Sequence, residues 1–298
     1  MNNKRKNRRR IGLKIVLLGL LTVLYPLGFM TYNDILAKDR MSDYLDEIKS
    51  MDVSKKNEIL QKAKEYNNRS FVSTDTLVDP FDVKSYSAIN PLDYEEGEVF
   101  AYISIPKIEQ DLPIYIGASQ YHLSLGVGQL DGTDMPIGGK NTRSVLTGHR
   151  GGVDQLFFRH LDRMEKGDII TITAFDEVLK YEVTDMEVIT PTDYEKLAVI
   201  PNEDMITLLT CTPYVTATHR LIVNAKRVEE KPIEVAKPQP QDVEVEQDLP
   251  VVDEKEVVSE RVVLEKNIIK ALIVLIIISI IIVIIKLINT FRKPKNIS

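Results

Sequence analysis

The fold of this chain depends most on one stretch, Thr207-Leu208-Leu209-Thr210-Cys211-Thr212-Pro213-Tyr214. It holds the single cysteine of the 298 residues, at the end of an apolar, β-branched run that predicts a buried strand. After a turn, a second apolar run follows, Leu221-Ile222-Val223, with Arg220 just before it. If the two strands pair as a hairpin, the thiol of Cys211 faces the guanidinium of Arg220.

A third reactive group lies upstream, in the run Ser144-Val145-Leu146-Thr147-Gly148-His149-Arg150-Gly151. The apolar part predicts a strand, and the glycines around His149 predict a turn where the backbone can approach a substrate closely. A thiol, an imidazole and a guanidinium at strand ends are typical of acyl transfer, so Cys211, His149 and Arg220 are the candidate catalytic residues. The alternative is that Cys211 is only a small core residue.

The other histidines are weaker candidates. His122 and His160 lie in polar surroundings, and we expect both on the surface. His219 adjoins Arg220, and neighbours on a strand point to opposite faces, so at most one of this pair faces Cys211.

Composition excludes several classes of protein. The net charge of −6 gives no sign of a nucleic-acid binder. One cysteine cannot form an intrachain disulfide, and one cysteine with four scattered histidines excludes a Cys-rich structural zinc site. We therefore predict neither a metal nor a cofactor.

Two apolar segments predict membrane helices. Ile11 to Met30 follows a strongly basic stretch and is long enough to span a bilayer, which needs about 20 residues. No small-residue cleavage site follows it, which favours an uncleaved anchor over a cleaved signal peptide. Ile268 to Ile288 is almost entirely Ile, Leu and Val between Lys270 and Lys286, and basic residues follow it as in a stop-transfer helix.

Positive charge flanks both membrane segments at the chain ends. The positive-inside rule then places the tails, residues 1–10 and 289–298, in the cytoplasm and residues 31–267 outside. No ATP is available there, so a reaction that conserves bond energy, such as transpeptidation, suits the location.

Residues 31–267, which are expected outside, fall into four regions of different composition. Residues 31–70 have helical periodicity, with a second helix expected from Asp52 or Ser54; the alternative is a solvated stalk. Residues 71–97 lack periodicity and carry Asp79-Pro80-Phe81. Residues 98–228 show short strands, and residues 229–267 form an acidic linker expected to be extended or disordered.

Many short strands at even spacing predict a β-barrel or sandwich. The strand containing Pro113 is expected at a sheet edge, because proline cannot donate to a ladder. Residues 155–161 are expected to form a helical insertion. The remaining predicted strands cover residues 99–105, 144–147, 168–173, 178–189, 205–210 and 221–223.

These residues together resemble a known family, the sortases, which are cysteine transpeptidases on the surface of Gram-positive bacteria. The resemblance rests on Leu146-Thr147-Gly148-His149, on the TLxTC signature at Thr207-Leu208-Leu209-Thr210-Cys211, and on Arg220. It implies a mostly β fold, a closed eight-stranded barrel with N-terminal helices. It also implies that Cys211, His149 and Arg220 are catalytic.

Within that family the chain resembles the pilus-assembling class C. That class carries a second, C-terminal membrane helix and an N-terminal lid with a DPW or DPF motif, which Asp79-Pro80-Phe81 matches. The resemblance implies that Asp79 pairs with Arg220 and that Phe81 covers Cys211. The alternative for this motif is a generic turn, since Asp-Pro often begins one.

The resemblance implies a two-pass protein of the Gram-positive cell membrane that cleaves a Thr–Gly bond in an LPxTG-like sorting signal. A Cys thioester forms, and the acyl group passes to a lysine of the next pilin subunit. Thr210 and Thr147 are expected to line the groove for the sorting signal.

Two other functions remain open at this point. One is a housekeeping sortase that attaches proteins to peptidoglycan. The other is a membrane-anchored β-domain that only binds a partner, with Cys211 structural.

Overall fold

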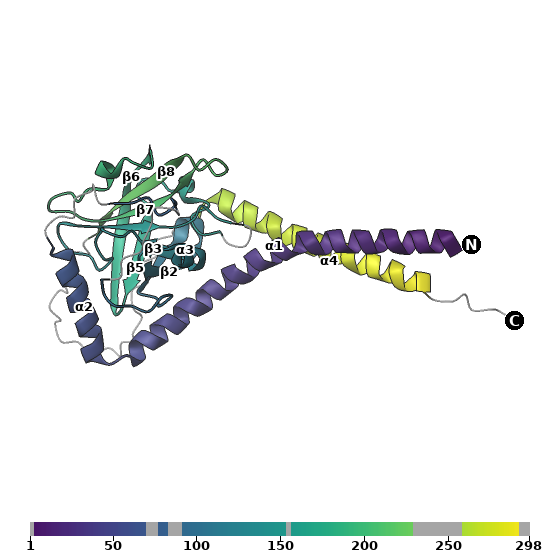
Figure 1. The fold of residues 1–298 in the computed structure, drawn as a ribbon, viewed down its shortest axis with the longest axis horizontal. Coiled ribbons are helices and arrows are strands. Elements are labelled where there is room, and N and C mark those ends of the chain that lie inside the picture. Colours follow the sequence, from purple (N-terminus) through teal and green to yellow (C-terminus); the bar gives the residue numbers. More distant parts are fainter. Residues whose placement is uncertain (1–2, 70–76, 83–90, 153–155, 229–257, 292–298) are drawn as a thin grey trace, which may run out of the picture.

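The fold is described from a computed structural model, which covers residues 3–69, 77–82, 91–152, 156–228 and 258–291. Within these residues eight strands form a closed barrel in the order β1-β2-β3-β4-β7-β8-β6-β5 (Figure 1). The predicted eight-stranded barrel is confirmed. The strands are β1 (Ala101–Ile105), β2 (Gln110–Ile116), β3 (Val127–Gln129), β4 (Thr142–Thr147), β5 (Ile169–Ala174), β6 (Glu177–Ile189), β7 (Asp204–Thr212) and β8 (His219–Arg227).

Most neighbouring strands are antiparallel, but β2 with β3 and β4 with β7 are parallel. The short strand β3 was not predicted, and it corrects the expectation that β2 lies at an edge. A closed barrel has no edge. Pro113 is tolerated because pairing with β3 begins only at Ile114, so the residue without an N–H lies outside that ladder.

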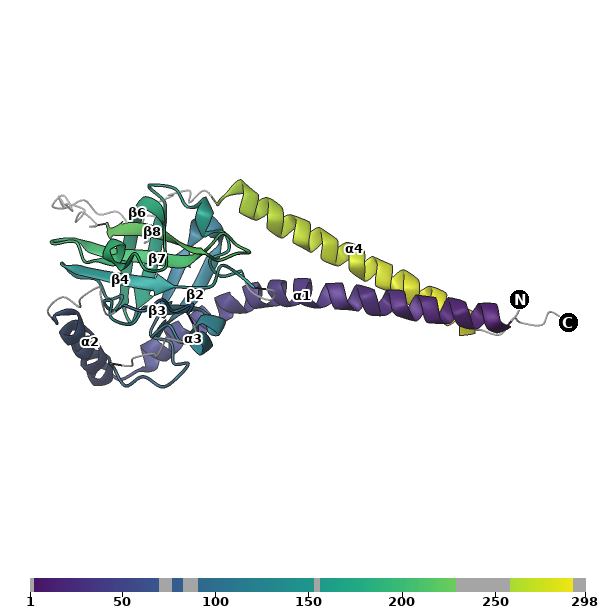
Figure 2. The same ribbon diagram turned by 45° about the horizontal axis from the view of Figure 1, so that its top comes forward.

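The predicted hairpin is present. Strands β7 and β8 pair antiparallel, and Cys211 lies opposite Arg220. Figure 2 shows β4, β7 and β8 as neighbours on one wall of the barrel. The apolar residues of β7 and β8 are buried in the barrel wall, which explains why their sequences read as continuous apolar runs.

The helical insertion predicted for residues 155–161 is wrong. The described residues from 156 onward form turns followed by a single 3-10 turn, Leu161–Arg163. Phe157 has a φ of 40°, which a right-handed helix does not accept. Tertiary burial decides the conformation here, because Phe157, Phe158 and Leu161 all enter the core.

Four α-helices accompany the barrel in the described part of the chain. They are α1 (Asn3–Ser50), α2 (Val53–Asn67), α3 (Gln120–Leu125) and α4 (Glu260–Phe291). Helix α1 continues unbroken from the first apolar segment to the barrel. There Tyr44 is buried, and its hydroxyl donates to the Phe100 carbonyl at 2.9 Å and accepts from the Phe175 amide at 3.0 Å.

Helix α2 begins after Asp52, whose carboxylate accepts from the amide of Ser54. Ala63 on α2 is fully buried, so residues 33–66 do not form a solvated stalk. Helices α1 and α4 are both long and apolar enough to cross a membrane.

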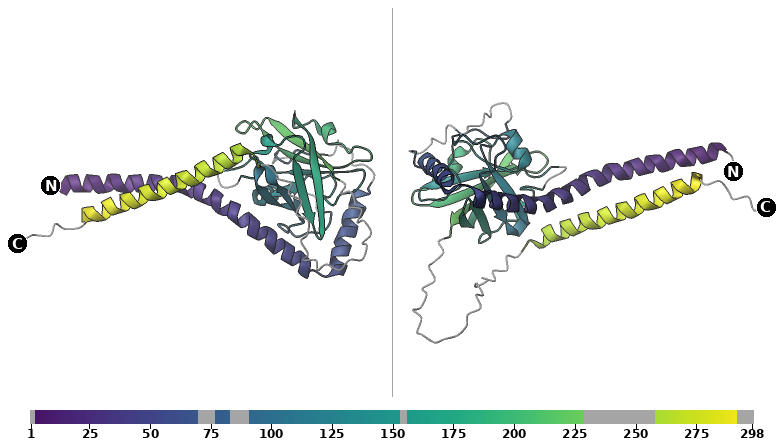
Figure 3. Two further views of the ribbon diagram at one scale, coloured as in Figure 1. Left: turned by 180° about the vertical axis from the view of Figure 1, so that it is seen from behind. Right: turned by 90° about the horizontal axis from the view of Figure 1, so that it is seen from below.

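The two long helices run side by side away from the barrel (Figure 3). At their far ends the guanidinium of Arg10 donates to the carbonyl of Thr290 at 2.6 Å and lies 4.1 Å from the ring of Phe291. The start of α1 and the end of α4 therefore lie next to each other, remote from the barrel.

The first turns of α4 belong to the barrel domain. Val262 is fully buried in the main core, and the amide of Ser259 donates to the carbonyl of Lys107 at 2.9 Å. Glu265 pairs with Arg159 at 3.2 Å. The expected linker therefore ends earlier than residue 267, since α4 begins at Glu260; residues 229–257 lie outside the described part.

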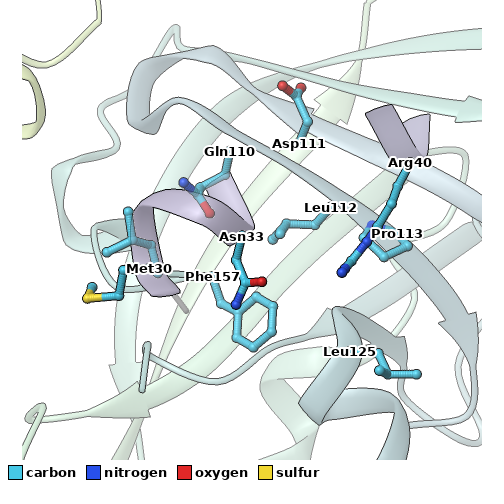
Figure 4. Close-up of a pocket in the computed structure, with 10 residues that line it drawn as sticks. Met30, Asn33, Arg40, Gln110, Asp111, Leu112, Pro113, Leu125 and Phe157 are labelled. Carbon is cyan, nitrogen blue, oxygen red and sulfur yellow. The ribbon is translucent and has the colours of Figure 1, made fainter. Parts of the chain in front are cut away.

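A hollow lies where α1 passes over β2 (Figure 4). None of the three candidate catalytic residues lines it. Its walls are Met30, Asn33, Arg40, Gln110, Asp111, Leu112, Pro113, Leu125, Leu156 and Phe157. It marks where the part of α1 that follows the apolar segment rests on the barrel.

The docking of α4 gives a stability prediction. Val262→Asp places a carboxylate in the core, which costs about 2 kcal/mol or more without a partner. We expect the full-length chain in detergent to unfold several degrees lower, measured by circular dichroism. Val263→Asp is the matched control, because Val263 adjoins Val262 but is itself 39% exposed. Equal melting curves for the two variants would show that the first turns of α4 do not stabilise the barrel.

Candidate active site

Parallel pairing of β4 with β7 brings His149 and Cys211 to one level. Thr147 lies opposite Leu209 in this ladder, and His149 and Cys211 each follow two residues later. Two parallel strands end at the same edge, so the imidazole and the thiol emerge together. Both residues are half-buried.

The backbone before His149 is fixed by the strand that carries Cys211. The amide of Gly148 donates to the Leu209 carbonyl at 3.1 Å, and the hydroxyl of Thr210 donates to the Gly148 carbonyl at 2.7 Å. Gly148 is required by close packing, because a Cβ there would lie 2.9 Å from the ring of Phe158. The loop is tied again after the histidine, where the amide of Phe158 donates to the His149 carbonyl.

Thr147 and Thr210 do not line an open groove, contrary to the expectation from the sequence. Both side chains are fully buried. Neither presents a surface to a peptide in this structure. The hydroxyl of Thr210 instead holds the Gly148 carbonyl, one residue before the candidate base.

Arg220 lies opposite Cys211 and is buried. Its Nε and Nη2 atoms donate to the two carboxylate oxygens of Asp79. Its Nη1 atom donates to the carbonyls of Ala217 and His219 at 2.9 and 2.8 Å. All three nitrogens of the guanidinium are thus already engaged.

The segment 77–82 is docked on the site, while residues 71–76 and 83–90 of the expected lid lie outside the described residues. Asp79 is buried, and its amide donates to the hydroxyl of Tyr194 at 2.9 Å. The side chain of Gln120 donates to the Pro80 carbonyl at 2.8 Å. The motif is therefore held by several distant parts of the chain.

Phe81 lies between two of the candidate catalytic side chains. Its ring centroid is 5.6 Å from that of His149, and the Arg220 guanidinium carbon is 5.1 Å from it. This geometry combines an aromatic contact with a cation–π contact. The segment thus engages both His149 and Arg220.

Burial dominates the electrostatics of the site. It raises the pKa of the Cys211 thiol; Arg220 opposes this shift, Asp79 adds to it, and Arg150 opposes it. Burial also lowers the pKa of His149. Both shifts favour the neutral thiol and the neutral imidazole while the segment 77–82 is docked.

The expectation for two other histidines is wrong. His122 is buried: it stacks on Tyr115 at 5.0 Å and accepts from the amide of Gly97 through Nε2 at 3.1 Å. His160 is buried beside Glu265 of α4, with 3.5 Å between Nε2 and the carboxylate. In both cases a partner distant in sequence covers the ring. His219 is exposed, and Arg220 is the member of that pair that joins the site.

The sequence analysis missed several residues of the site. Tyr194 and Gln120 hold the docked segment, and no local pattern marks them. Arg150 contacts the backbone of Cys211, and its position next to His149 was the available signal. Among the described residues, no group of three or more His, Cys, Asp or Glu side chains is placed to hold a metal ion.

Comparison with known proteins agrees with this geometry. The family model of the sortase domain matches residues 103–228. A sortase C structure from Streptococcus pneumoniae superposes with a TM-score of 0.59 and 34% identity, covering 64% of this chain and 97% of that one.

The chain belongs to the sortase family. A pilus-related sortase C of Group B Streptococcus superposes equally well, with a TM-score of 0.59, 37% identity, and coverage of 63% of this sortase and 96% of that chain. Sortase A of Streptococcus agalactiae is 31% identical over 131 residues, which cover 43% of this sortase and 52% of that protein. A sortase of Streptomyces coelicolor is 32% identical over 163 residues, covering 50% and 46%. This sortase thus spans about half the length of these curated relatives.

The contact between Thr210 and Gly148 gives a testable prediction. Thr210→Val keeps the shape of the side chain but leaves a buried carbonyl unpaired, which costs about 1–3 kcal/mol. We expect faster hydrogen exchange in residues 145–150, measured by mass spectrometry on the full chain in detergent. Thr210→Ser keeps the hydroxyl and should exchange as the parent does; equal rates for the valine variant would contradict the assigned role.

Proposed function

We propose that this sortase is a cysteine transpeptidase that joins pilin subunits. One observation carries the proposal: the parallel ends of β4 and β7 bring His149 level with Cys211, while β8 places Arg220 opposite the thiol. A nucleophile, a base and a hydrogen-bond donor then meet at one barrel end, as acyl transfer requires.

The first half-reaction cleaves a Thr–Gly bond in an LPxTG-like sorting signal. His149 takes the thiol proton, and the Cys211 thiolate attacks the threonine carbonyl carbon to give a tetrahedral oxyanion. Arg220 donates hydrogen bonds to that oxyanion or to the peptide backbone. The C–N bond then breaks, and the His149 imidazolium gives its proton to the leaving glycine amine. A thioester on Cys211 remains.

The second half-reaction passes the acyl group to an amine. His149 removes a proton from the incoming lysine of a second pilin subunit, and the amine attacks the thioester carbon. The C–S bond breaks and an isopeptide bond forms. The thiolate recovers the proton from His149, so the reaction needs no cofactor and no external energy source.

The segment 71–97 acts as a lid in this proposal. The hydrogen bonds of Arg220 to Asp79 occupy the donors that the oxyanion needs, and Phe81 contacts His149. A tethered segment competes with substrate at an effective concentration in the ~mM range. Opening of the lid therefore precedes substrate binding.

We propose a two-pass topology with both tails in the cytoplasm. The contact of Arg10 with Thr290 and Phe291 supports it, because the start of α1 and the end of α4 then lie at one membrane surface. In this arrangement residues 1–10 and 289–298 are cytoplasmic, α1 crosses at residues 11–30 and α4 at residues 268–288. The helical region 31–70, the lid 71–97, the barrel 98–228, the linker that ends before α4 and the first turns of α4 face outward.

The pilin acceptor is favoured over peptidoglycan by the likeness to sortase C structures, one of them a pilus-related sortase. The docked Asp79-Pro80-Phe81 segment and the second apolar helix point the same way. A binding domain with a structural cysteine is disfavoured, because Cys211 is half-buried at a strand end rather than enclosed in the core.

The thioester gives the first test. The full-length chain in detergent, incubated with an LPxTG-type peptide, should gain the mass of the acyl fragment on Cys211, read by mass spectrometry. Cys211→Ala should give no adduct, and His149→Ala should slow its formation roughly 10²-fold or more. His219→Ala is the matched control, since this exposed histidine precedes Arg220 and should change nothing.

The acceptor is tested by adding either a pilin domain with its lysine or a glycine-type amine to the acyl-enzyme. Product with the pilin supports polymerisation, whereas product only with glycine would replace it with cell-wall anchoring. A folded chain that forms no adduct with any sorting peptide would refute the enzyme assignment.

The lid gives a separate prediction. Asp79→Ala with Phe81→Ala removes a carboxylate that raises the pKa of Cys211 and uncovers the site. The thiolate fraction at a given pH then rises, and so does the open fraction, so we expect alkylation by iodoacetamide to be roughly tenfold faster. Asp82→Ala, which removes an exposed carboxylate from the same segment, should label at the parent rate. Equal rates for all three proteins would exclude a lid.

A further inference from the structure

Arg150 directly follows His149, yet it reaches the strand of Cys211. Its Nη1 atom donates to the hydroxyl of Thr212 at 2.6 Å and to the carbonyl of Cys211 at 3.4 Å. Its Nη2 atom lies 3.4 Å from the carboxylate of Asp162. One guanidinium thus contacts the residue that carries the nucleophile and the residue after it.

The side chain of Arg150 is only 12% exposed. Burying a cation is unfavourable unless partners compensate, and Asp162 and Thr212 provide them. Its Nε atom has no hydrogen-bond partner among the described residues. An arginine on the surface keeps its charge solvated and has no such desolvation cost. The burial of Arg150 therefore indicates a role in the site.

Asp162 anchors the far side of this contact. It belongs to the 3-10 turn Leu161–Arg163, which follows the loop tied to the His149 carbonyl through the amide of Phe158. Arg163 also approaches Asp162, at 3.7 Å, but its side chain is 37% exposed. Two arginines therefore share the carboxylate of Asp162. Of the two, Arg150 is the one that also donates to the carbonyl of Cys211.

We propose that Arg150 is a positioning residue for acyl transfer, joining the loop of His149 to the strand of Cys211 and placing a fixed positive charge near the thiol. The charged groups that act on this thiol are Arg220 from β8, Asp79 from the segment 77–82, and Arg150. When substrate displaces Asp79, the two arginines remain and favour the thiolate. Arg220 serves the substrate oxygens, whereas Arg150 stays bound to the protein backbone.

Only the part of this inference that concerns acyl transfer rests on the proposed function. The charge effect is measured on the thiol itself by alkylation, which requires no sorting signal and no acceptor. Failure of the transpeptidation assay therefore leaves the test of Arg150 intact.

The experiment compares Arg150→Met, Arg150→Lys and the matched control Arg163→Met in the full-length chain in detergent. Each variant also carries the Asp79→Ala and Phe81→Ala changes, so that access to the thiol is equal. The pH midpoint of iodoacetamide alkylation is measured for each. Arg150→Met should move the midpoint upward by roughly half a pH unit or more, because an opposite charge favours the thiolate. Arg150→Lys keeps the charge and should stay near the parent, as should Arg163→Met.

The kinetics of sorting-peptide turnover distinguish a positioning role of Arg150 from a role in protein stability alone. With the lid intact, Arg150→Met should lower kcat roughly tenfold or more while KM changes little, because the group does not bind the peptide. Arg150→Lys should recover only part of kcat, since an ammonium cannot reproduce the fork of contacts to Thr212 and Asp162. If Arg150→Met does not fold, Asp162→Asn is the second variant, and it should lower kcat without raising the midpoint.

An unchanged alkylation midpoint together with an unchanged kcat in folded Arg150→Met would overturn the proposal. So would equal effects of Arg150→Met and Arg163→Met, because both would then reflect only the loss of a partner for Asp162. Parent-like kcat in both Arg150→Lys and Asp162→Asn would likewise remove the positioning role.

Discussion

The site depends on the parallel pairing of β4 with β7. Parallel strands end at the same edge, so His149, just after β4, and Cys211, near the end of β7, are brought together although they are 62 residues apart in sequence. The connection between the two strands is long and includes β5 and β6, as a parallel crossover requires. The antiparallel return of β8 then adds Arg220 at the same edge.

In the proposed function, the buried guanidinium of Arg220 binds either the substrate or the lid. Arg220 is buried and needs an anionic or carbonyl partner, which Asp79 provides in the docked state. A developing oxyanion needs the same donors. In the proposed function, lid and substrate therefore compete for the same donors as well as for the same space. Phe81 strengthens the exclusion, since it contacts both His149 and Arg220.

The second apolar helix, α4, also packs against the barrel domain. Its first turns enter the barrel core through Val262, and Glu265 contacts Arg159 and His160. Those two residues belong to the same stretch as Phe158 and Asp162, which hold the His149 loop and Arg150. The first turns of α4 and the candidate active site are therefore parts of one packed body.

The sequence by itself determined the short strands, the apolar helices and the hairpin that sets Cys211 against Arg220, because each is encoded by local periodicity and by neighbours along the chain. It left a barrel and a sandwich open, and the closed barrel followed only from the resemblance to the sortases. Only the tertiary structure decided what depends on distant partners: the short parallel strand β3, the burial of His122 and His160, the enclosed positions of Thr147 and Thr210, and the reach of Arg150 to Thr212. A pattern of residue types records which face of a strand is apolar. It does not record which remote element covers that face, and burial of a polar side chain is settled by that element.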